Sequence, residues 1–332
     1  VNTLCRLVNY LEHNGDTCVL VAPSGSPREF GGSRVFPVPA LNAPLYPELK
    51  IAAPWVNLDK ELDSFQPELV HILNPVALGL IGIRYARRRF IPLVASYHTD
   101  IPGFARRWGL GALSDGLWKY LRWLHNKADL NLCPSRATQI ELASQGFERV
   151  RIWTRGVDTN HFSPAHASPQ MRRRLSSGHE CSKLLLYVGR LSAEKRIHWL
   201  KDILLSSPGT HLAIVGDGPQ RHELEATFQG TPVTFMGYMR GADLSAAYAS
   251  SDIFVFPAAN ETFGNVALEA MASGLPVVAP HAGGLLDFID HGVTGLLFEQ
   301  ESRPSLVENS RRLIDDLTLA KHIGAAARRY AE

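Results

Sequence analysis

The chain is poor in cysteine and has no long hydrophobic run. Among its 332 residues are four cysteines, without the spacing of a metal site: Cys5, Cys18, Cys133 and Cys181. The first three fall in predicted helices or strands, which favours reduced thiols in a cytoplasmic protein over disulfide bonds. No apolar stretch reaches the roughly eighteen residues that a membrane-spanning helix requires, and no signal peptide opens the chain. These absences argue against a disulfide-rich secreted domain and against an integral membrane protein.

A marked charge imbalance is also missing. The chain carries 34 Lys and Arg against 32 Asp and Glu, a net charge of +2, so its overall charge gives no indication of a nucleic-acid partner. It contains no Asp-x-Asp pair and no cluster of His and acidic residues at metal-ligand spacing. We therefore expect no metal and no other cofactor.

What the chain does have is the composition of a large globular protein. It is 45% hydrophobic and 20% charged, and its length favours two domains over one. Short apolar strands alternate with helical patterns, which predicts βαβ units, parallel sheets and the α/β fold class. The strands are predicted at 17–22, 69–72, 93–97, 130–133, 150–153, 184–188, 211–215, 233–236, 253–256 and 277–279, and the main helices at 76–89, 115–126 and 136–145.

The alternation forms two series separated by a polar stretch of irregular pattern. We expect a first Rossmann-like domain over 1–162, a connection over 163–182 that includes three consecutive arginines, and a second Rossmann-like domain over 183–332. The chain begins within an amphipathic helix that Gly15 closes, and it ends within a helical pattern. We interpret it as a fragment trimmed at both termini.

Two glutamates, Glu261 and Glu269, stand eight residues apart in the run ETFGNVALEAMASG. The strand predicted at 253–256 precedes this run, so Glu261 lies on a loop at the C-terminal edge of a parallel sheet, where open α/β folds bind ligands. Gly264 lets a ligand approach the backbone, and the N–H groups at the start of the next helix suit an anion. A carboxylate beside an anion site indicates a ligand with both phosphates and hydroxyls, such as a nucleotide sugar. The alternative is a capped amphipathic helix with two solvated acids.

This string resembles the Glu-x7-Glu signature of family 4 retaining glycosyltransferases, which have the two-domain GT-B fold. The resemblance implies two doubly wound Rossmann-like domains facing a cleft, with a nucleotide-sugar donor bound to the second. It implies that Glu261 holds hydroxyls of the donor sugar and that Glu269 holds the ribose hydroxyls. The neighbouring residues of the same string are then donor-binding: Phe263, Gly264, Asn265 and Val266.

A second candidate site follows the strand predicted at 184–188. Gly189 and Arg190 come directly after this strand, and Lys195 follows five residues later. Two cations on a loop at the C-terminal end of a strand can neutralise a diphosphate, Arg through its planar fork and Lys as a point charge. They match the diphosphate-binding Arg and Lys of the family. Basic residues that merely decorate a solvated loop are the alternative.

The strand predicted at 211–215 ends in Gly216-Asp217-Gly218-Pro219. A Rossmann dinucleotide site needs a third glycine that this turn lacks, so we interpret Gly216 and Gly218 as backbone lining the cleft. Further on, the segment 235–239 resembles the stretch that lies along the nucleotide base in the family. This resemblance implies backbone contacts at Tyr238 and Met239.

In the first half, His98 follows the strand predicted at 93–97 and so lies at the cleft edge. The resemblance implies that His98 contacts the donor sugar near the reacting carbon; a structural turn histidine is the alternative. Asp100 either orients His98 or meets the acceptor. Arg155 resembles a hinge-side residue that faces the phosphates, whereas Asp158 is interpreted as structural.

Two further features leave two interpretations each. Gly283-Gly284 is either a second anion-binding turn or a simple tight turn. Residues 104–124 hold three of the six tryptophans, interleaved with basic residues, which suits a helix lying in an anionic membrane surface. A core helix with a basic outer face is the alternative. The basic residues that would share this surface are Arg84, Arg87, Arg88, Arg89, Arg106, Arg107, Lys119 and Arg122.

Over the whole chain the resemblance is closest to the lipid-directed branches of the family, the bacterial GDP-mannose-dependent α-mannosyltransferases and the sulfoquinovosyltransferases. It implies transfer of a hexosyl group with retained α configuration from a GDP- or UDP-sugar, GDP-mannose being the best candidate, to a lipid or glycolipid acceptor. The protein is then cytoplasmic and peripheral on the inner face of the cell membrane. The strand and Gly-rich loop that open the family's first domain are missing here, and its C-terminal crossover helix is incomplete.

Alternatives remain for donor, mechanism and class. A UDP-sugar could supply a sulfoquinovosyl or glucosyl group to diacylglycerol. No pair of carboxylates suits a double-displacement glycosidase, so we favour a front-face route in which the leaving diphosphate helps to deprotonate the acceptor. A sugar-nucleotide epimerase of GT-B fold and a catalytically inactive binding subunit are the other classes.

Overall fold

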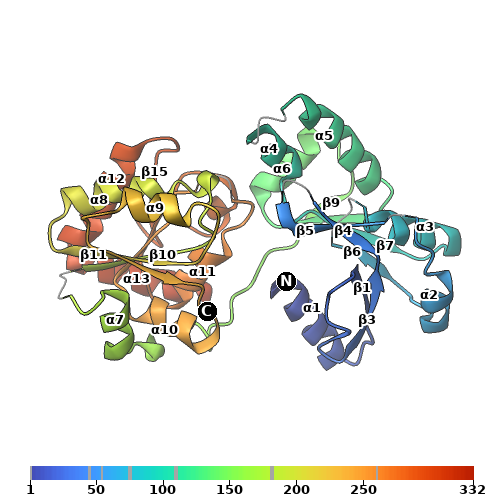
Figure 1. Ribbon diagram of the computed structural model, residues 1–332, viewed down its shortest axis with the longest axis horizontal. Helices are drawn as coiled ribbons and strands as arrows, with labels where there is room; N and C mark the ends of the chain where they lie inside the picture. Colours follow the sequence, from blue (N-terminus) through green and yellow to red (C-terminus); the bar gives the residue numbers. More distant parts are fainter. Residues whose placement is uncertain are drawn as a thin grey trace. The chain divides into compact units, whose positions relative to one another are not determined.

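The computed structural model describes residues 2–43, 46–53, 55–73, 77–107, 111–179, 183–258 and 261–332. The chain divides into two compact units (Figure 1). The first unit comprises residues 1–134 and 138–154, and the second comprises residues 135–137 and 155–332. Each unit is described below by itself.

The second unit is built on one parallel sheet of six strands, in the order β12-β11-β10-β13-β14-β15. In chain order this is 3-2-1-4-5-6, the order of a doubly wound Rossmann sheet, whose direction reverses between β10 and β13. The strands are β10 (Lys183–Val188), β11 (Thr210–Val215), β12 (Val233–Gly237), β13 (Ile253–Val255), β14 (Val277–Pro280) and β15 (Leu296–Phe298).

Helices cover both faces of this sheet (Figure 1), with α8 and α12 packed together on one face and α11 and α13 on the other. The α-helices are α7 (Pro169–Leu175), α8 (Leu200–Ser206), α9 (Arg221–Thr227), α10 (Gly241–Ala249), α11 (Asn265–Ala272), α12 (Arg303–Asp315) and α13 (Leu317–Ala331). Short 3₁₀ turns are η1 (Pro164–His166), η2 (Ala193–Lys195), η3 (Ile197–Trp199) and η4 (Gly283–Asp287).

The second unit has one continuous hydrophobic core. Strands β11, β13, β14 and β15 are buried along their whole length, as expected for a parallel sheet covered on both faces. Three aromatic rings, Tyr187, Phe254 and Phe256, stack in this core beside the point where the strand order reverses.

The first unit contains a parallel sheet of four strands, in the order β6-β7-β8-β9, and smaller sheets of order β1-β3-β2 and β4-β5. Its strands are β1 (Val19–Pro23), β2 (Glu29–Phe30), β3 (Ser33–Val38), β4 (Ala40–Ala43), β5 (Tyr46–Ala52), β6 (Val70–Ile72), β7 (Leu93–Ser96), β8 (Leu130–Cys133) and β9 (Val150–Ile152). Its helices are α1 (Asn2–His13), α2 (Asp59–Phe65), α3 (Gly79–Arg89), α4 (Ile101–Arg107), α5 (Gly111–His125) and α6 (Arg136–Ser144).

The predicted strands are found within two residues of their expected ends, but the segment between β1 and α2 differs from the expectation of alternating helices. It forms β2 to β5, including antiparallel pairs. The physical reason is visible in β3, where Val35, Phe36 and Val38 are buried while Arg34 and Pro37 are exposed. Such β-branched and aromatic residues favour a strand over a helix.

The division between the units also falls earlier than the connection expected at 163–182. Phe162 is buried in the second core, and Arg328 on α13 donates hydrogen bonds to the carbonyls of Thr159 (3.0 Å) and Phe162 (2.8 Å). Within the expected connection, α7 buries Met171 and Leu175 in the same core. The sequence did not predict α7 because its polar residues outnumber its two buried ones. Residues from Arg155 onward belong to the second unit.

Candidate functional site

The loops after β10 and β13 meet where the strand order of the second unit reverses. The connections that follow two neighbouring parallel strands go to opposite faces of the sheet at this point, which opens a crevice at the carboxyl ends of the strands. Open α/β sheets bind ligands in such a crevice. Lys195 ends the turn η2 after β10, and Glu261 follows β13. Their side chains form an ion pair, with 2.9 Å between Lys195 Nζ and Glu261 Oε2, across 66 residues of sequence.

The ion pair lies against the aromatic ring of Phe256. Lys195 Nζ lies 5.6 Å from the centre of the Phe256 ring, and Phe256 is buried in the core. The side chains of Lys195 and Glu261 keep 18% and 24% of their surface exposed. Because this environment is partly desolvated and still open, the pair combines a fixed cation and a fixed carboxylate that a ligand can reach.

Glycines allow η4 to pack directly on the loop that carries Glu261. A Cβ atom at Gly284 would lie 2.3 Å from the carbonyl oxygen of Thr262, and the Gly284 N–H donates to the Glu261 carbonyl at 3.2 Å. Gly264, which precedes α11, has φ of +99°, a left-handed conformation that favours glycine. The predicted turn at Gly283-Gly284 therefore buttresses the Glu261 loop by close packing of backbones.

A hydrogen bond from the buried Tyr248 positions Glu269. The Tyr248 hydroxyl donates to Glu269 Oε2 at 3.1 Å. Burial and then the adjacent carboxylate raise the pKa of Tyr248 well above its usual value, so this hydroxyl keeps its proton. Glu269 lies in the second turn of α11, one helix away from Tyr248 on α10.

The glycines predicted to line a cleft bring two loops of the second unit into contact. A Cβ atom at Gly216 would lie 1.9 Å from the Gly189 carbonyl oxygen, and one at Gly218 would lie 2.4 Å from that of Leu191. The Gly189 N–H bonds to the Val215 carbonyl and the Leu191 N–H to the Asp217 carbonyl, both at 3.0 Å. These glycines thus lock the loop after β10 to the loop after β11, which fixes the backbone leading to Lys195.

Two family matches cover most of the chain. Residues 1–161 match the family described as Glycosyltransferase Family 4, and residues 182–316 match Glycosyl transferases group 1. The chain belongs to glycosyltransferase family 4.

Curated relatives agree with this family. The chain is 37% identical over 339 residues to the sulfoquinovosyl transferase SQD2 of Arabidopsis thaliana, covering 100% of the chain and 66%, about two thirds, of that protein. It is 38% identical over 302 residues to a GDP-mannose-dependent alpha-mannosyltransferase of Mycobacterium tuberculosis, covering 89% of the chain and 79% of that protein.

A solved structure agrees with the fold. Anabaena Alr3699/HepE in complex with UDP matches with a TM-score of 0.76 and 23% identity, over 99% of this chain and 90% of that one. The fold is that of the GT-B glycosyltransferases, as the sequence predicted.

The other predicted donor-binding residues of this family 4 glycosyltransferase lie around the same sheet edge in different settings. Arg190 is half-buried directly after β10, and its carbonyl accepts a hydrogen bond from the Tyr187 hydroxyl at 3.2 Å. Asn265 is exposed and Val266 half-buried in the first turn of α11, whereas Phe263 is buried against Phe288, with ring centres 5.3 Å apart.

The two residues predicted along the nucleotide base differ sharply in exposure. Tyr238, which follows β12, is 67% exposed, and the guanidinium of Arg240 lies 4.5 Å over its ring. Met239 is buried in the core, so only its backbone is available for the predicted contact.

The candidate residues of the first unit lie after β7. His98 is half-buried, with its ring centre 6.3 Å from that of Trp153. The Asp100 carboxylate accepts a hydrogen bond from the Gly103 N–H at 2.8 Å, which caps the start of α4. Asp158, in the second unit, accepts from the N–H groups of Asn160 (3.0 Å) and His161 (2.9 Å), consistent with the structural role predicted for it.

Arg155 begins the second unit and is half-buried. Burial lowers the pKa of its guanidinium from the usual value. Such a shift leaves an arginine charged at neutral pH.

The sequence missed the residues that support the site from below. Phe256, which contacts Lys195, was predicted only as the end of a buried strand, and Tyr248, which contacts Glu269, was not predicted at all. A signal existed for Phe256, since it is the last residue of an apolar run directly before the Glu261 loop. Tyr248 offered none, because its relation to Glu269 depends on how α10 and α11 pack.

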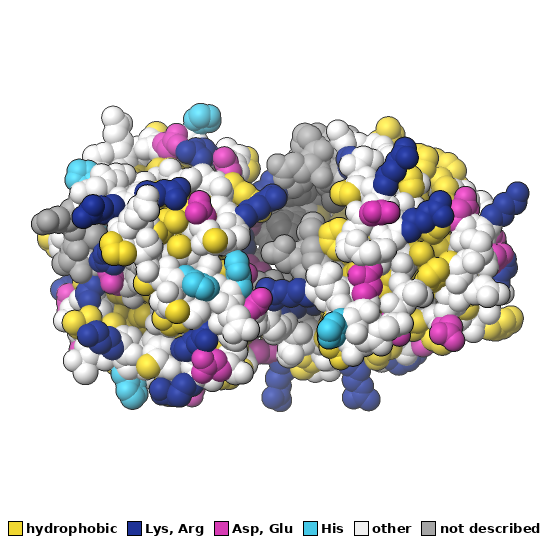
Figure 2. All heavy atoms as spheres, turned by 90° about the horizontal axis from the view of Figure 1, so that it is seen from below, with side chains coloured by type: hydrophobic (Ala, Val, Ile, Leu, Met, Phe, Trp, Pro, Cys, Tyr) yellow, Lys and Arg dark blue, Asp and Glu magenta, His cyan; other side chains and the backbone are white. Residues whose placement is uncertain are grey.

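The predicted membrane-facing segment is only partly described. Trp108 and the side chain of Arg107 lie outside the described residues. In α5, Trp118 is buried in the core, whereas Trp123 is 52% exposed and has Lys127 Nζ 4.5 Å from its ring centre. On the face shown in Figure 2, basic and acidic side chains are interspersed on both units. No described helix is both long enough and apolar enough to cross a bilayer.

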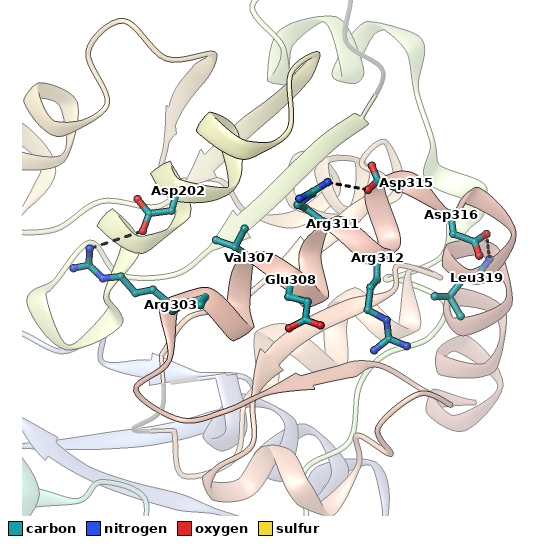
Figure 3. A pocket seen from close by; sticks show the side chains of 10 residues that line it. Asp202, Arg303, Val307, Glu308, Arg311, Arg312, Asp315, Asp316 and Leu319 are labelled. Carbon is teal, nitrogen blue, oxygen red and sulfur yellow. Dashed lines mark hydrogen bonds and ion pairs between the residues drawn. The ribbon is translucent and has the colours of Figure 1, made fainter.

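One hollow of the second unit, of about 980 Å³, lies along α12 and holds none of the predicted site residues (Figure 3). Two ion pairs lie at this hollow, Arg303–Asp202 (3.9 Å) and Arg311–Asp315 (3.8 Å). Within the described ranges, no three His, Cys, Asp or Glu side chains are grouped as they would be around a metal ion.

Proposed function

We propose that this family 4 glycosyltransferase moves a hexosyl group from a nucleoside-diphosphate sugar to a lipid or glycolipid acceptor and retains the α configuration. The observation that supports this proposal best is the Lys195–Glu261 ion pair, with 2.9 Å between its charged atoms. It lies where the strand order of the second unit's sheet reverses. A cation beside a carboxylate suits a ligand that has both a diphosphate and sugar hydroxyls.

GDP-mannose is our first choice of donor. A relative that is 38% identical over 89% of the chain is named a GDP-mannose-dependent alpha-mannosyltransferase. A UDP-sugar with a sulfoquinovosyl group is the second choice, because the plant relative at 37% identity over 100% of the chain is named a sulfoquinovosyl transferase. Both names are compatible with one diphosphate site and differ in the sugar, and the first also states the nucleotide.

The loop cations hold the diphosphate in this proposal. Lys195 turns its ammonium from Glu261 toward the phosphates, and Arg190 supplies the second positive charge. The first turn of α11, opened by Gly264, adds N–H groups without intrahelical partners. A helix end contributes roughly 0.3–2 kcal/mol, so the two side chains carry most of the neutralisation.

The reaction breaks the bond between the anomeric carbon of the sugar and the diphosphate oxygen. The acceptor hydroxyl oxygen forms the new bond on the same face, and the departing diphosphate takes up the hydroxyl proton. Negative charge develops on the diphosphate as the bond breaks, and Lys195 and Arg190 stabilise it there. Glu261 orients the sugar by accepting hydrogen bonds from its hydroxyls.

The remaining candidates orient the donor. Glu269, fixed by the Tyr248 hydroxyl at 3.1 Å, accepts hydrogen bonds from the ribose hydroxyls. The exposed Tyr238 lies at the end of β12, where the backbone at 238 and 239 meets the base. His98 of the first unit contacts the sugar near the reacting carbon.

Isothermal calorimetry with GDP, UDP and ADP tests the site before any acceptor is known. We expect tight binding of one diphosphate, GDP first, and loss of that binding in Lys195→Ala. Sugar transfer from the matching donor to a lipid acceptor then distinguishes a transferase from an epimerase, which converts the donor alone. Failure of all three nucleotides to bind would overturn the proposal.

The cations make a divalent metal unnecessary in this mechanism. We expect full transfer activity in an excess of chelator, because Lys195 and Arg190 replace the metal as counter-charge to the diphosphate. Strict dependence on magnesium or manganese would contradict it.

We also propose that α5 docks the protein on an anionic membrane surface. Exposed Leu113 and Trp123 stand on this helix beside the exposed basic residues Lys119 and Arg122. An interfacial helix combines such residues, and each basic residue near an anionic surface contributes about 1 kcal/mol. This is the expected place for an enzyme whose acceptor is a lipid.

Co-sedimentation with phosphatidylglycerol vesicles at low salt measures this docking. Trp123→Ala combined with Lys119→Gln should release the protein, whereas Trp55→Ala, at a 78% exposed tryptophan outside α5, should leave binding unchanged. Absence of binding by the unchanged protein at low salt would end the idea.

A further inference from the structure

Arg196, the residue directly after Lys195, has a left-handed backbone. Its φ is 51° and its ψ is 33°, and it caps the turn η2 that ends in Lys195. Residues other than glycine seldom adopt this conformation because the Cβ crowds the following carbonyl oxygen. Contacts from elsewhere must therefore hold Arg196 in place.

Two contacts of the Arg196 side chain supply that support. Its Nη2 lies 2.5 Å from Glu301 Oε1, and its guanidinium lies 4.9 Å over the indole ring of the buried Trp199. Glu301 stands in the loop between β15 and α12 and is itself left-handed, with φ of 69°. Arg196 thus ties the loop that carries Lys195 to a loop about a hundred residues further along the chain.

This arrangement is locally costly. Besides the left-handed backbone, Arg196 Nη1 is buried without a hydrogen-bond partner in the part of the chain that the structure describes. A left-handed residue and an unsatisfied donor are both unfavourable, and such features persist at positions where the surroundings over-determine them, often at functional sites. Both features belong to Arg196, which directly follows Lys195, the candidate diphosphate-binding cation, and this position suggests that they serve to place Lys195.

A second arginine at the same indole offers a natural comparison. The Arg303 guanidinium lies 5.3 Å from the Trp199 ring and pairs with Asp202 at 3.9 Å. Arg303 and Asp202 line the hollow along α12 (Figure 3). Two arginines therefore contact the Trp199 ring, and only Arg196 belongs to the backbone turn that carries Lys195.

We propose that Arg196 is a positioning residue for sugar transfer. By locking the end of η2 through Trp199 and Glu301, it holds the Lys195 ammonium where it meets Glu261 and, in turn, the donor diphosphate. Arg196 itself does not contact the donor. This inference rests on the proposed function, because the diphosphate is what Lys195 is positioned to bind.

Arg196→Asn tests the inference, with Arg303→Ala as the matched control. Asparagine tolerates the left-handed region, so the turn survives while the ion pair and the stacking are lost. We expect kcat/KM for transfer to fall about ten- to a hundredfold, because displacement of a catalytic group lowers the rate by such factors. The calorimetric affinity for the nucleoside diphosphate should fall about tenfold. Arg303→Ala should change both by less than about threefold, as surface substitutions do.

A second variant and a stability measurement separate positioning from folding. Glu301→Gln removes the ion pair from its exposed end and should reproduce part of the loss. All variants are compared well below their thermal midpoints, so that a merely structural role would lower the midpoint and leave kcat/KM unchanged. Arg196→Lys, which keeps the charge opposite Glu301, should recover part of the activity.

The outcomes separate this inference from the proposed function. If the unchanged protein binds a nucleoside diphosphate through Lys195 and Arg196→Asn behaves like Arg303→Ala, the positioning role is overturned and the proposed function stands. If the unchanged protein binds no nucleoside diphosphate, both are overturned.

Discussion

The two units are built from similar α/β elements but organise them differently. The second unit buries one continuous core around a single six-stranded sheet. The described residues of the first unit form three smaller core clusters around several sheets. A single rigid sheet fixes the positions of all the loops at its edge relative to one another.

This difference explains why the candidate chemistry concentrates in the second unit. Lys195, Glu261 and Glu269 come from separate loops and helices of that unit, and a hydrogen bond or ion pair holds each of them. In the first unit, His98 follows a four-residue strand. We infer that the second unit supplies preorganised charge, which is the largest contribution in the proposed transfer from a nucleoside-diphosphate sugar.

Removing one candidate side chain at a time is the most direct test of whether the second unit contributes more to transfer than the first. Lys195→Ala and Glu261→Ala should each lower the transfer rate by about 10²–10³ or more, because each removes a preorganised charge at the reacting group. His98→Ala should cost less, about ten- to a hundredfold. Circular dichroism checks that the fold is intact, and near-normal turnover of either second-unit variant would refute its assignment.

Truncation of buried leucines tests whether the two cores are independent. Leu212→Ala in the second unit and Leu121→Ala in the first should each cost about 2–5 kcal/mol, because both side chains are almost completely buried. Separate cores predict two calorimetric transitions, with each variant shifting only its own. Equal shifts of both transitions would show that the units unfold as one.

Adding a methyl group at a glycine should have opposite effects in the two units. Gly284→Ala places a Cβ 2.3 Å from the Thr262 carbonyl oxygen and should destabilise the second unit by about 1–3 kcal/mol. It should also lower transfer, because the Glu261 loop moves. Gly116→Ala, in α5, adds a Cβ that has no described atom within 4 Å apart from its own helix backbone, and it should stabilise the first unit by about 0.5–1 kcal/mol. Urea unfolding measures both.

A further expected effect is acid sensitivity of the first unit through His125. This side chain is buried, and its Nδ1 donates to Asn131 Oδ1 at 2.8 Å, since the Asn131 amide donates elsewhere. Burial lowers the pKa of His125 from its usual 6.5. The unfolded chain therefore binds the proton first, and stability that is full above about pH 6.5 is lost as the pH falls toward the lowered folded pKa.

The loss through His125 is at most about 1.4 kcal/mol per pH unit. Unfolding free energies at pH 7.5 and 5.5 should differ less in His125→Gln than in the unchanged protein. An equal difference in both proteins would assign the sensitivity elsewhere, for example to His211 of the second unit, whose pKa is lowered by burial and by His179.

The sequence predicted the second unit better than the first. Strands such as β11 and β14 are continuous apolar runs buried on both sides, and such runs are recognisable without any knowledge of their neighbours. The small strands β2 to β5 are short and partly exposed, so their local pattern carries little signal. Helix α7 was missed because its three arginines mask the buried Met171 and Leu175.

The candidate site was predicted as residue types rather than as a geometry. Arg190, Lys195 and Glu261 could be singled out because each follows a recognisable strand, and Glu269 because it stands eight residues after Glu261. Whether each takes the role predicted for it stays a prediction. Tyr248 and Arg196 could not be singled out, since what distinguishes them is a contact or a backbone angle.

By itself the sequence determined the alternation of strands and helices, the α/β class and the kinds of side chain that follow each strand, because these depend on local spacing and hydrophobicity. Only the tertiary structure decided that β10 lies next to β13 and that Lys195 therefore meets Glu261 across 66 residues. Strand order depends on how crossover connections wind around the sheet, and that is a property of the whole fold rather than of any segment.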